Sequence, residues 1–278
     1  MAIKKMQLHF NKAYEIAPNV MHLHFYPQYS SSKDINKGID KGPFEFIPGQ
    51  FITLLFDHED GVKRRSYSIS TIPKNQDSQK DSEQDSQQNS EQNGIGFAIS
   101  YLKDGIASEA LFNIKPNTII NAIGPAGKLI LKEKEDIENN YNRYILVGTG
   151  TGIAPYRSML PQIKSILNKN KNFSIDLIFG ARTREDLFYI QDFLNLSESE
   201  PRFKVHAQLS RMDKDNILNS YENHGYAQTA FDRLEVDPEK DIIYLCGNPK
   251  MIDDSFEILT DKGFESTQIR REKYISSN

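Results

Sequence analysis

Cysteine is nearly absent from this sequence: the 278 residues include one, Cys246. A disulfide needs two cysteines, so a disulfide framework within the chain is excluded. A cysteine-ligated iron–sulfur cluster needs about four protein ligands, so none is expected among these residues. If the protein transfers electrons, a second redox centre is therefore expected on a partner.

Long apolar runs and an excess of positive charge are also missing. No stretch approaches the roughly 20 apolar residues of a membrane span, and residues 1–10 lack the apolar run of a signal peptide. Lysine and arginine total 34 against 38 acidic residues, a net charge of −4, whereas nucleic-acid-binding domains are usually strongly basic. We expect a soluble, cytoplasmic protein with no membrane insertion and no nucleic-acid partner.

The sequence gives little support for a metal site and none for a hydrolase site. His22 and His24 share one face of a predicted strand, but two ligands without a nearby third are too few for a closed zinc site. The sequence has no G-x-S-x-G nucleophile elbow. We therefore expect no metal site and no hydrolase site.

The chain is long enough for two domains, and its 38% hydrophobic residues suffice for a core in each. The first half contains short strand-like runs separated by turn residues, with one helix expected near 108–112. The strand-like runs lie at 20–25, 50–56, 67–70, 95–100 and 119–123. This spacing favours an antiparallel β-barrel, which we assign to residues 1–138.

One segment of the first half cannot contribute to a core. Residues 75–93 consist only of Asn, Gln, Asp, Ser, Lys and Glu. Because nothing there can be buried to offset the entropy of ordering, the segment is predicted to be a disordered surface insertion. Its flanks are strand-like, which indicates a long hairpin loop rather than a linker between domains.

The pattern changes after the charged segment 132–142 to alternating strands and helices. Strands are predicted at 143–147, 173–179, 203–209 and 241–245, and helices at 155–167, 184–194 and 249–262. Such alternation indicates a parallel sheet covered by helices on both faces. We assign this α/β domain to residues 139–278.

A glycine-rich loop, GTGTGIAP at 148–155, joins a predicted strand to a predicted helix. Glycines leave room for a phosphate against bare amides, and Pro155 suits a first helical position. The helix N-terminus then offers unpaired N–H groups to a pyrophosphate; the alternative is a glycine-rich turn that binds nothing. The residues of the predicted phosphate site are Gly148, Thr149, Gly150, Thr151, Gly152 and Pro155.

The loop differs from the usual dinucleotide fingerprint, because its spacing is G-x-G-x-G. The next predicted strand is followed by Arg182, without the acidic residue that binds a ribose 2′-hydroxyl. An arginine there suits a 2′-phosphate and so favours NADP(H). A solvated surface arginine is the alternative.

Five motifs occur in the order of one known family, over nearly the whole chain from about Gln7 to Tyr274. They are RSYS at 65–68, GIAS at 105–108, the glycine loop, Ser-Arg at 210–211 with Tyr-Ala-Gln at 226–228, and CGNPKM at 246–251. With these motifs the chain resembles the ferredoxin/flavodoxin–NADP reductase-type flavoproteins. That resemblance implies a Greek-key FAD-binding barrel followed by an NADP-binding α/β domain; the insertion at 75–93 is the main departure.

The resemblance implies an FAD site built around the first motif. Arg65 would neutralise a flavin phosphate, Tyr67 would lie against the flavin, and Ser68 would donate to N5, the atom that accepts hydride. The other implied FAD contacts are Ala98, Ser100, Gly105, Ile106, Ala107, Ser108 and Tyr274. Ser108 also suits a plain helix N-cap, and the residues after Tyr274 suit a frayed polar tail.

The resemblance likewise implies the rest of an NADP site. Ser210 and Arg211 would hold the 2′-phosphate, and Tyr226 and Gln228 would contact the adenine; without the resemblance, a solvated loop is favoured. The turn beside the nicotinamide would contain Cys246, Gly247, Pro249 and Met251, with Glu272 nearby. Cys246 would shape the site and is not expected to be a nucleophile, and a buried cysteine that acts as a small hydrophobe is the alternative.

The implied activity is hydride transfer between NADP(H) and FAD, with single electrons passed to or from a ferredoxin or flavodoxin. Ser68, Cys246 and Glu272 are the candidate catalytic residues. Fold does not fix function, so three alternatives stay open: the reductase component of an oxygenase, an NAD(P)H:flavin reductase, and a non-catalytic binding subunit of the same fold.

Overall fold

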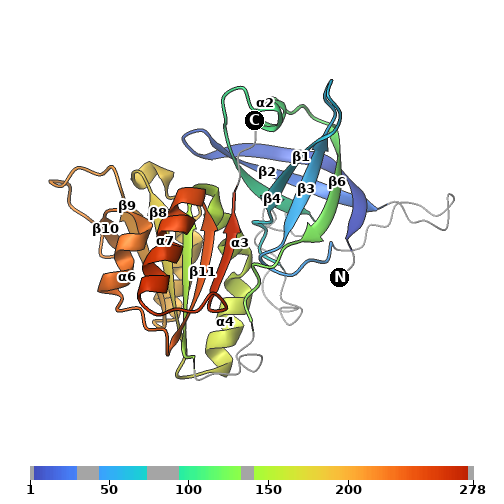
Figure 1. Cartoon of the computed structure of the whole chain (residues 1–278). Coiled ribbons are helices and arrows are strands. Elements are labelled where there is room, and N and C mark those ends of the chain that lie inside the picture. Colours follow the sequence, from blue (N-terminus) through green and yellow to red (C-terminus); the bar gives the residue numbers. More distant parts are fainter. Residues whose placement is uncertain (1–2, 30–43, 74–93, 133–140, 275–278) are drawn as a thin grey trace. The chain divides into compact units, whose positions relative to one another are not determined.

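The computed structural model describes residues 3–29, 44–73, 94–132 and 141–274 (Figure 1). The chain divides into two compact units between Ile130 and Leu131. The predicted insertion at 75–93 and the predicted boundary between residues 138 and 139 fall outside the described residues.

The first unit is an antiparallel sheet, as the sequence predicts, but it has six strands: five overlap the predicted runs, and the strand at residues 4–17 was not predicted. Its strands are β1 (Lys4–Ala17), β2 (Val20–Tyr29), β3 (Phe51–Phe56), β4 (Lys63–Ser68), β5 (Ile95–Ser100) and β6 (Ile119–Ala126), in the order β4-β3-β6-β1-β2-β5. A bridge between Ile69 and Phe97 joins the segment after β4 to β5. The two edge strands therefore meet, which closes the sheet into a barrel.

Alternating side chains build the barrel core. In β3, Ile52, Leu54 and Phe56 are buried while their neighbours are half-buried, because successive side chains of a strand point to opposite faces. Phe25 and Phe97 join the same core, with ring centroids 5.9 Å apart. The helix α2 (Ile106–Phe112), expected near 108–112, packs onto this core.

The second unit is a parallel six-stranded sheet with helices, again as predicted. Its strands are β7 (Arg143–Thr149), β8 (Ser174–Ala181), β9 (Phe203–Leu209), β10 (Glu222–His224), β11 (Asp241–Gly247) and β12 (Ile269–Lys273), in the order β10-β9-β8-β7-β11-β12. From β7 the chain moves outward to β10 and then returns to β11 on the other side of β7. In such sheets, ligands bind outside the carboxyl ends of the strands at this reversal point.

Two predicted helices are each interrupted in the structure. The segment 155–167 forms α3 (Ala154–Ser158) and α4 (Leu160–Lys169). Pro161 has no N–H to continue a helix, and it lies in the first turn of α4, where none is needed. The segment 184–194 forms a 3₁₀ turn, η3 (Arg184–Asp186), and then α5 (Ile190–Ser199), with Tyr189 between them in the left-handed region at φ 60°.

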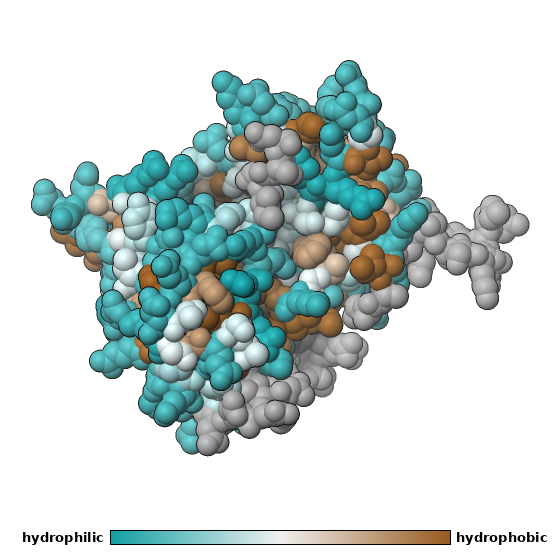
Figure 2. All heavy atoms as spheres, in the orientation of Figure 1, coloured by the Kyte–Doolittle hydropathy of each residue, from teal (hydrophilic) through white to brown (hydrophobic). Residues whose placement is uncertain are grey.

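The remaining elements of the second unit are the 3₁₀ turns η2 (Gly150–Ile153) and η4 (Ala227–Thr229) and the helices α6 (Ala230–Arg233) and α7 (Pro249–Asp261). No helix within the described part of the chain has the length and apolar character needed to cross a bilayer. Hydrophilic side chains cover much of the face shown in Figure 2, with apolar side chains between them.

Candidate functional site

Two loops meet at the reversal point of the parallel sheet. A β-carbon added to Gly152, in the loop after β7, would overlap the carbonyl oxygen of Cys246 at the end of β11. One added to Gly247 would lie 2.5 Å from the carbonyl oxygen of Thr149. The two loops therefore pack backbone against backbone, and glycine is required at both contact points.

The hydroxyl groups of Thr149 and Tyr156 hold this arrangement together. The backbone N–H of Asn248 donates to the Thr149 hydroxyl oxygen (3.1 Å), which ties the loop after β11 to the loop after β7. The fully buried Tyr156 lies between the carbonyl oxygens of Val147 and Tyr244, 3.1 and 2.9 Å from its hydroxyl. Sequence reasoning missed Tyr156; its only signal is an aromatic residue directly after Pro155.

The glycine loop leaves open space at the carboxyl edge of the sheet. Gly150 lies in the left-handed region at φ 53°, and apart from its two chain neighbours no described residue has a heavy atom within 4 Å of the place where its β-carbon would be. Thr151 is half-buried beside it, and the loop continues through η2 into α3. An anion placed at Gly150 would therefore face the backbone of a turn that leads into a helix.

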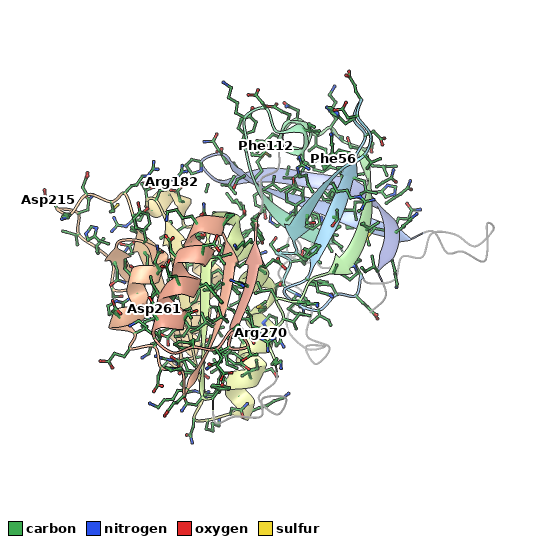
Figure 3. The ribbon with its side chains drawn as sticks, viewed as in Figure 1. Phe56, Phe112, Arg182, Asp215, Asp261 and Arg270 are labelled. Carbon is green, nitrogen blue, oxygen red and sulfur yellow. The ribbon has the colours of Figure 1, made fainter. Side chains whose placement is uncertain are left out.

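The predicted 2′-phosphate residues lie together at the same edge. The Ala181 carbonyl oxygen accepts from the backbone N–H of Ser210 (3.0 Å), and the Arg182 carbonyl oxygen accepts from that of Arg211 (2.8 Å). Both arginines are exposed. Figure 3 shows Arg182 at this edge, apart from Asp261 at the end of α7 and Arg270 on β12.

Tyr226 and Gln228 stand beside these residues. The backbone N–H of Gly225 donates to the Leu209 carbonyl at the end of β9 (3.1 Å). Ala227 is buried over Gly180, whose added β-carbon would lie 2.7 Å from the Thr149 methyl group and 3.0 Å from the Ala227 β-carbon. The Tyr226 side chain is 65% exposed. An aromatic face is therefore open to solvent above the carboxyl ends of the strands.

An ion pair closes the loop that contains Arg211. Arg184 makes a two-pronged contact with Glu222, at 2.7 Å from Nε to Oε1 and 2.6 Å from Nη2 to Oε2, and also donates to the Ile217 carbonyl (2.6 Å). The Glu222 carboxylate also accepts from the backbone N–H of Asn219 (2.8 Å). The hydrogen bond from Arg184 is the main reason why the pKa of Glu222 falls from 4.5 to about 2.

We expect Glu222→Gln to lower the free energy of unfolding by about 2 kcal/mol at pH 7, because it removes a charge-assisted hydrogen bond. The folded-state pKa lies below the unfolded value, so the carboxylate stabilises the fold above about pH 4.5 and loses this effect as the pH falls toward 2. Urea unfolding at pH 7 and pH 3.5 tests this. An equal difference between wild type and variant at both pH values would contradict it.

Cys246, Glu272 and Tyr274 meet at the end of β11. Cys246 is fully buried and pairs in register with Glu272 of β12. The backbone N–H of Tyr274 donates to the Gly247 carbonyl (2.9 Å). Burial, and secondly the charge of Glu272, raise the pKa of the Cys246 thiol well above its usual range, while a hydrogen bond with Tyr274 opposes this. The thiol therefore stays neutral, as expected of a residue that is not a nucleophile.

In the barrel, the first motif lies on β4 and is divided between its two faces. Tyr67 and Arg65 pair with the core residues Ile52 and Leu54, whereas Ser68 pairs with Phe51. Directly paired residues share a face, so Arg65 and Tyr67 lie on one side and Ser68 on the other. Burial raises the pKa of Tyr67 to about 12, with Arg65 opposing. Its phenol is therefore neutral.

The second barrel motif begins α2. Gly105 is the N-cap residue of the helix, so Ser108 is not. The buried Ser108 hydroxyl lies 2.6 Å from the carbonyl oxygen of Leu102 and 3.0 Å from that of Gly105. Ser108 thus closes the turn before the helix. Ile106 and Ala107 follow in the first turn of α2, and the other two predicted FAD contacts, Ala98 (buried) and Ser100 (exposed), lie on β5.

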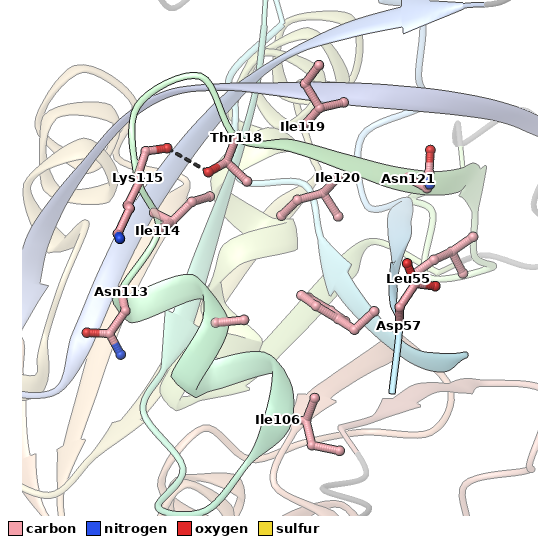
Figure 4. Close-up of a pocket in the computed structure, with 12 residues that line it drawn as sticks. Leu55, Asp57, Ile106, Asn113, Ile114, Lys115, Thr118, Ile119, Ile120 and Asn121 are labelled. Carbon is pink, nitrogen blue, oxygen red and sulfur yellow. Dashed lines mark hydrogen bonds between the residues drawn. The ribbon is translucent and has the colours of Figure 1, made fainter. Parts of the chain in front are cut away.

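A cavity of about 440 Å³ lies in the barrel unit beside α2 (Figure 4). Its lining consists of Leu55, Phe56, Asp57, Ile106, Ala110, Asn113, Ile114, Lys115, Thr118, Ile119, Ile120 and Asn121. Ile106 is the only lining residue that the sequence analysis assigns to a site. The Thr118 hydroxyl donates to the Lys115 carbonyl (2.7 Å), which holds the loop at the rim. We assign the cavity no ligand.

The two histidines considered as metal ligands pack within the barrel sheet. The His22 ring stacks on Tyr14 at 5.0 Å, and His24 Nδ1 lies 3.0 Å from the amide nitrogen of Asn11. The His22 ring lies over Gly96 of β5 and the His24 ring over Gly94 just before this strand, and an added β-carbon at either glycine would overlap or crowd the ring. In the described ranges, no three His, Cys, Asp or Glu side chains are grouped to bind a metal ion.

Comparison with known proteins finds a family match within the second unit. Residues 146–256 match the family model described as the oxidoreductase NAD-binding domain. The chain is 27% identical over 219 residues to the reductase component of the naphthalene 1,2-dioxygenase system of Pseudomonas putida (76% of this chain, 55% of that protein). It is 28% identical over 240 residues to the reductase component of propane 2-monooxygenase of Rhodococcus jostii (86% and 58%). The chain thus spans little more than half the length of these relatives.

Solved structures share the fold of the whole chain. A ferredoxin NADP+ reductase from Neisseria gonorrhoeae with bound FAD and NADP aligns with a TM-score of 0.71 at 20% identity, covering 98% of this chain and 99% of that one. The cytochrome P450 reductase GcoB of Amycolatopsis aligns with a TM-score of 0.74 at 19% identity (99% and 71%). At these identities, the likeness concerns the fold.

Proposed function

We propose that this chain, which has the fold of the ferredoxin–NADP reductase-type flavoproteins, is a flavin-dependent oxidoreductase that transfers hydride between NADP(H) and FAD. The observation that carries the proposal is the backbone contact of Gly152 with Cys246 at the reversal point of a parallel sheet. Arg182, Ser210 and Arg211 lie at the same edge of that sheet. Together they offer space for a pyrophosphate and cations for a 2′-phosphate.

In the second unit, each group has a separate task under this proposal. The backbone of the loop at Gly150 would receive the pyrophosphate, and Arg182 and Arg211 would pair with the 2′-phosphate. Tyr226 supplies an exposed aromatic face for the adenine. The neutral Cys246 thiol and Glu272 would border the nicotinamide, where a protonated thiol adds bulk without charge.

In the first unit, β4 supplies the flavin contacts under this proposal. A bound flavin provides a ring that accepts hydride and releases electrons singly. Tyr67 fits such a ring because its phenol is half-buried, neutral and packed toward Phe97, with ring centroids 6.2 Å apart. Arg65, on the same face, would pair with the flavin phosphate. Ser68, at the end of the strand, would donate to the flavin N5.

A ferredoxin or flavodoxin is the proposed partner, and the cytoplasm the proposed location. The second candidate function is the reductase component of an oxygenase. The relatives from Pseudomonas putida and Rhodococcus jostii, which are described as such components, favour it. Both functions require the same hydride step and differ in the acceptor.

Identification of the flavin released from the purified protein tests the cofactor, and turnover with NADPH and with NADH tests the nucleotide. We expect FAD and a preference for NADPH in dye reduction. Added ferredoxins, flavodoxins or oxygenase components then separate the two candidates by which of them accepts electrons. A colourless protein that takes up no flavin and oxidises no NADPH would contradict the proposal.

Ser68→Ala is expected to slow hydride transfer by about 10- to 100-fold, because it removes one hydrogen bond to the atom that gains electron density. The flavin should remain bound. Rapid mixing with NADPH measures the step, and Ser66→Ala is the matched control, since Ser66 lies on the same face of β4 and bonds Thr53 at 2.8 Å. An unchanged rate in Ser68→Ala, or an equal loss in Ser66→Ala, would count against this role.

A further inference from the structure

We propose that Asp254 is a positioning residue that fixes the amide of Gln228 so that its carbonyl oxygen selects a purine with an exocyclic amino group. The inference rests on the proposed function, since that purine would be the adenine of NADP(H). Gln228 belongs to η4 and Asp254 to α7, and the Gln228 amide nitrogen lies 3.3 Å from Asp254 Oδ2.

The chemistry of the pair decides which way the amide points. An ionised carboxylate only accepts hydrogen bonds, whereas an amide has a donating NH₂ end and an accepting oxygen end. The NH₂ end of Gln228 must therefore face Asp254. The carbonyl oxygen is then the end that Asp254 does not hold.

Lys250 holds the carboxylate from its other side. Its Nζ lies 2.8 Å from Oδ1 and 2.9 Å from Oδ2 of Asp254, one helical turn away on α7. The Lys250 side chain is 83% exposed and that of Asp254 32% exposed. This hydrogen bond with Asp254 is the main reason why the pKa of Lys250 is raised, so Lys250 is charged near neutral pH.

Gln228 lies close to the aromatic residue proposed to stack on the adenine. Gln228 follows the buried Ala227, which in turn follows Tyr226 with its exposed ring. Ala227 packs over Gly180 beside Thr149 of the glycine loop. An aromatic face and a fixed amide thus flank the same part of the carboxyl edge. A base that stacks on Tyr226 would meet an acceptor, which suits the amino group of adenine and opposes the oxo group of hypoxanthine.

The test compares dissociation constants of NADP+ and of its hypoxanthine analogue, measured by titration calorimetry on the purified protein with its bound flavin. We expect wild type to bind NADP+ about tenfold more tightly, because adenine gains one neutral hydrogen bond where the hypoxanthine analogue places two acceptors together. Asp254→Asn, which can accept or donate, frees the Gln228 amide to turn. In this variant, the ratio of the dissociation constant of the hypoxanthine analogue to that of NADP+ should therefore lie within about twofold of one.

Two further variants separate positioning from structure. Asp261→Asn, at the far end of the same helix (Figure 3), should keep the wild-type ratio. In a Gln228→Ala background, Asp254→Asn should change the ratio no further, because Asp254 acts through that amide. Either an unchanged ratio in Asp254→Asn or a further change in the double variant would overturn the inference.

The wild-type measurement also separates this inference from the proposed function. A protein that binds neither nucleotide contradicts the proposed function. Equal binding of NADP+ and its hypoxanthine analogue leaves the proposed function intact and overturns the role of Asp254 alone.

Discussion

Gly152→Ala is expected to abolish NADP(H) binding while leaving the barrel unit folded. The added methyl group would overlap the carbonyl oxygen of Cys246 and lie 2.6 Å from the α-carbon of Gly247. Both obstacles are backbone atoms, so no side chain can move aside. The loops after β7 and β11 must separate, and the turn proposed to bind the pyrophosphate loses its shape.

The cost to the fold should exceed that of an ordinary substitution. Overpacking lowers the free energy of unfolding by about 1–3 kcal/mol where neighbouring atoms can adjust. Because the added methyl group of Gly152→Ala meets backbone atoms, we expect a loss at the upper end of this range or above it. Thermal unfolding and NADP+ titration measure the two effects separately.

Gly263→Ala is the matched control, because it adds the same methyl group to the same unit. Gly263 follows α7 at φ 92°, and its added β-carbon would meet only Pro238, at 3.7 Å. This variant should lose about 1 kcal/mol from its left-handed backbone and keep nucleotide affinity. Intact NADP+ binding in Gly152→Ala would show that the close approach of the two loops does not shape the site.

Removal of both Arg182 and Arg211, the arginines proposed to bind the 2′-phosphate, is expected to reverse the preference for NADPH over NADH. A hydrogen bond to a charged group contributes about 1.5–3 kcal/mol, or roughly 10- to 100-fold in affinity. Arg182→Ala combined with Arg211→Ala should therefore lower kcat/KM for NADPH by about a thousandfold. The value for NADH, which has no 2′-phosphate, should stay within a few-fold of wild type.

The ratio of the two kcat/KM values is the measurement that checks this. Arg270→Ala serves as the control, because Arg270 lies on β12, at the other end of the strand order from β9 and β10 (Figure 3). It removes a positive charge without touching the proposed phosphate site. Equal losses with NADPH and NADH in the double variant would indicate damage to the fold rather than loss of 2′-phosphate recognition.

The sequence predicts those parts of the fold that depend on local pattern. Alternating and apolar runs predict five strands of the barrel, all but β1, and four strands of the parallel sheet. The strands β10 and β12 were not predicted, because they form the edges of that sheet and have the polar sequences ENH and IRREK. They are recognisable as strands only through pairing with β9 and β11.

The site divides in the same way. The glycine loop and the CGNPKM turn could be recognised from sequence, because the glycines that their backbone conformations require are visible in the local sequence. The contacts of Thr149 with Asn248, of Tyr156 with the carbonyl of Tyr244, and of Gln228 with Asp254 join segments 26 to 99 residues apart. Only folding brings such partners together, so a local sequence pattern does not predict these contacts.

Anaerobic rapid mixing of the flavin-loaded protein with NADPH tests the central claim most directly, because it observes hydride arriving at the flavin without any protein partner. We expect the visible absorbance of the oxidised flavin to disappear in a single turnover, faster with NADPH than with NADH. Flavin absorbance that persists in the presence of excess NADPH and excess NADH would contradict it.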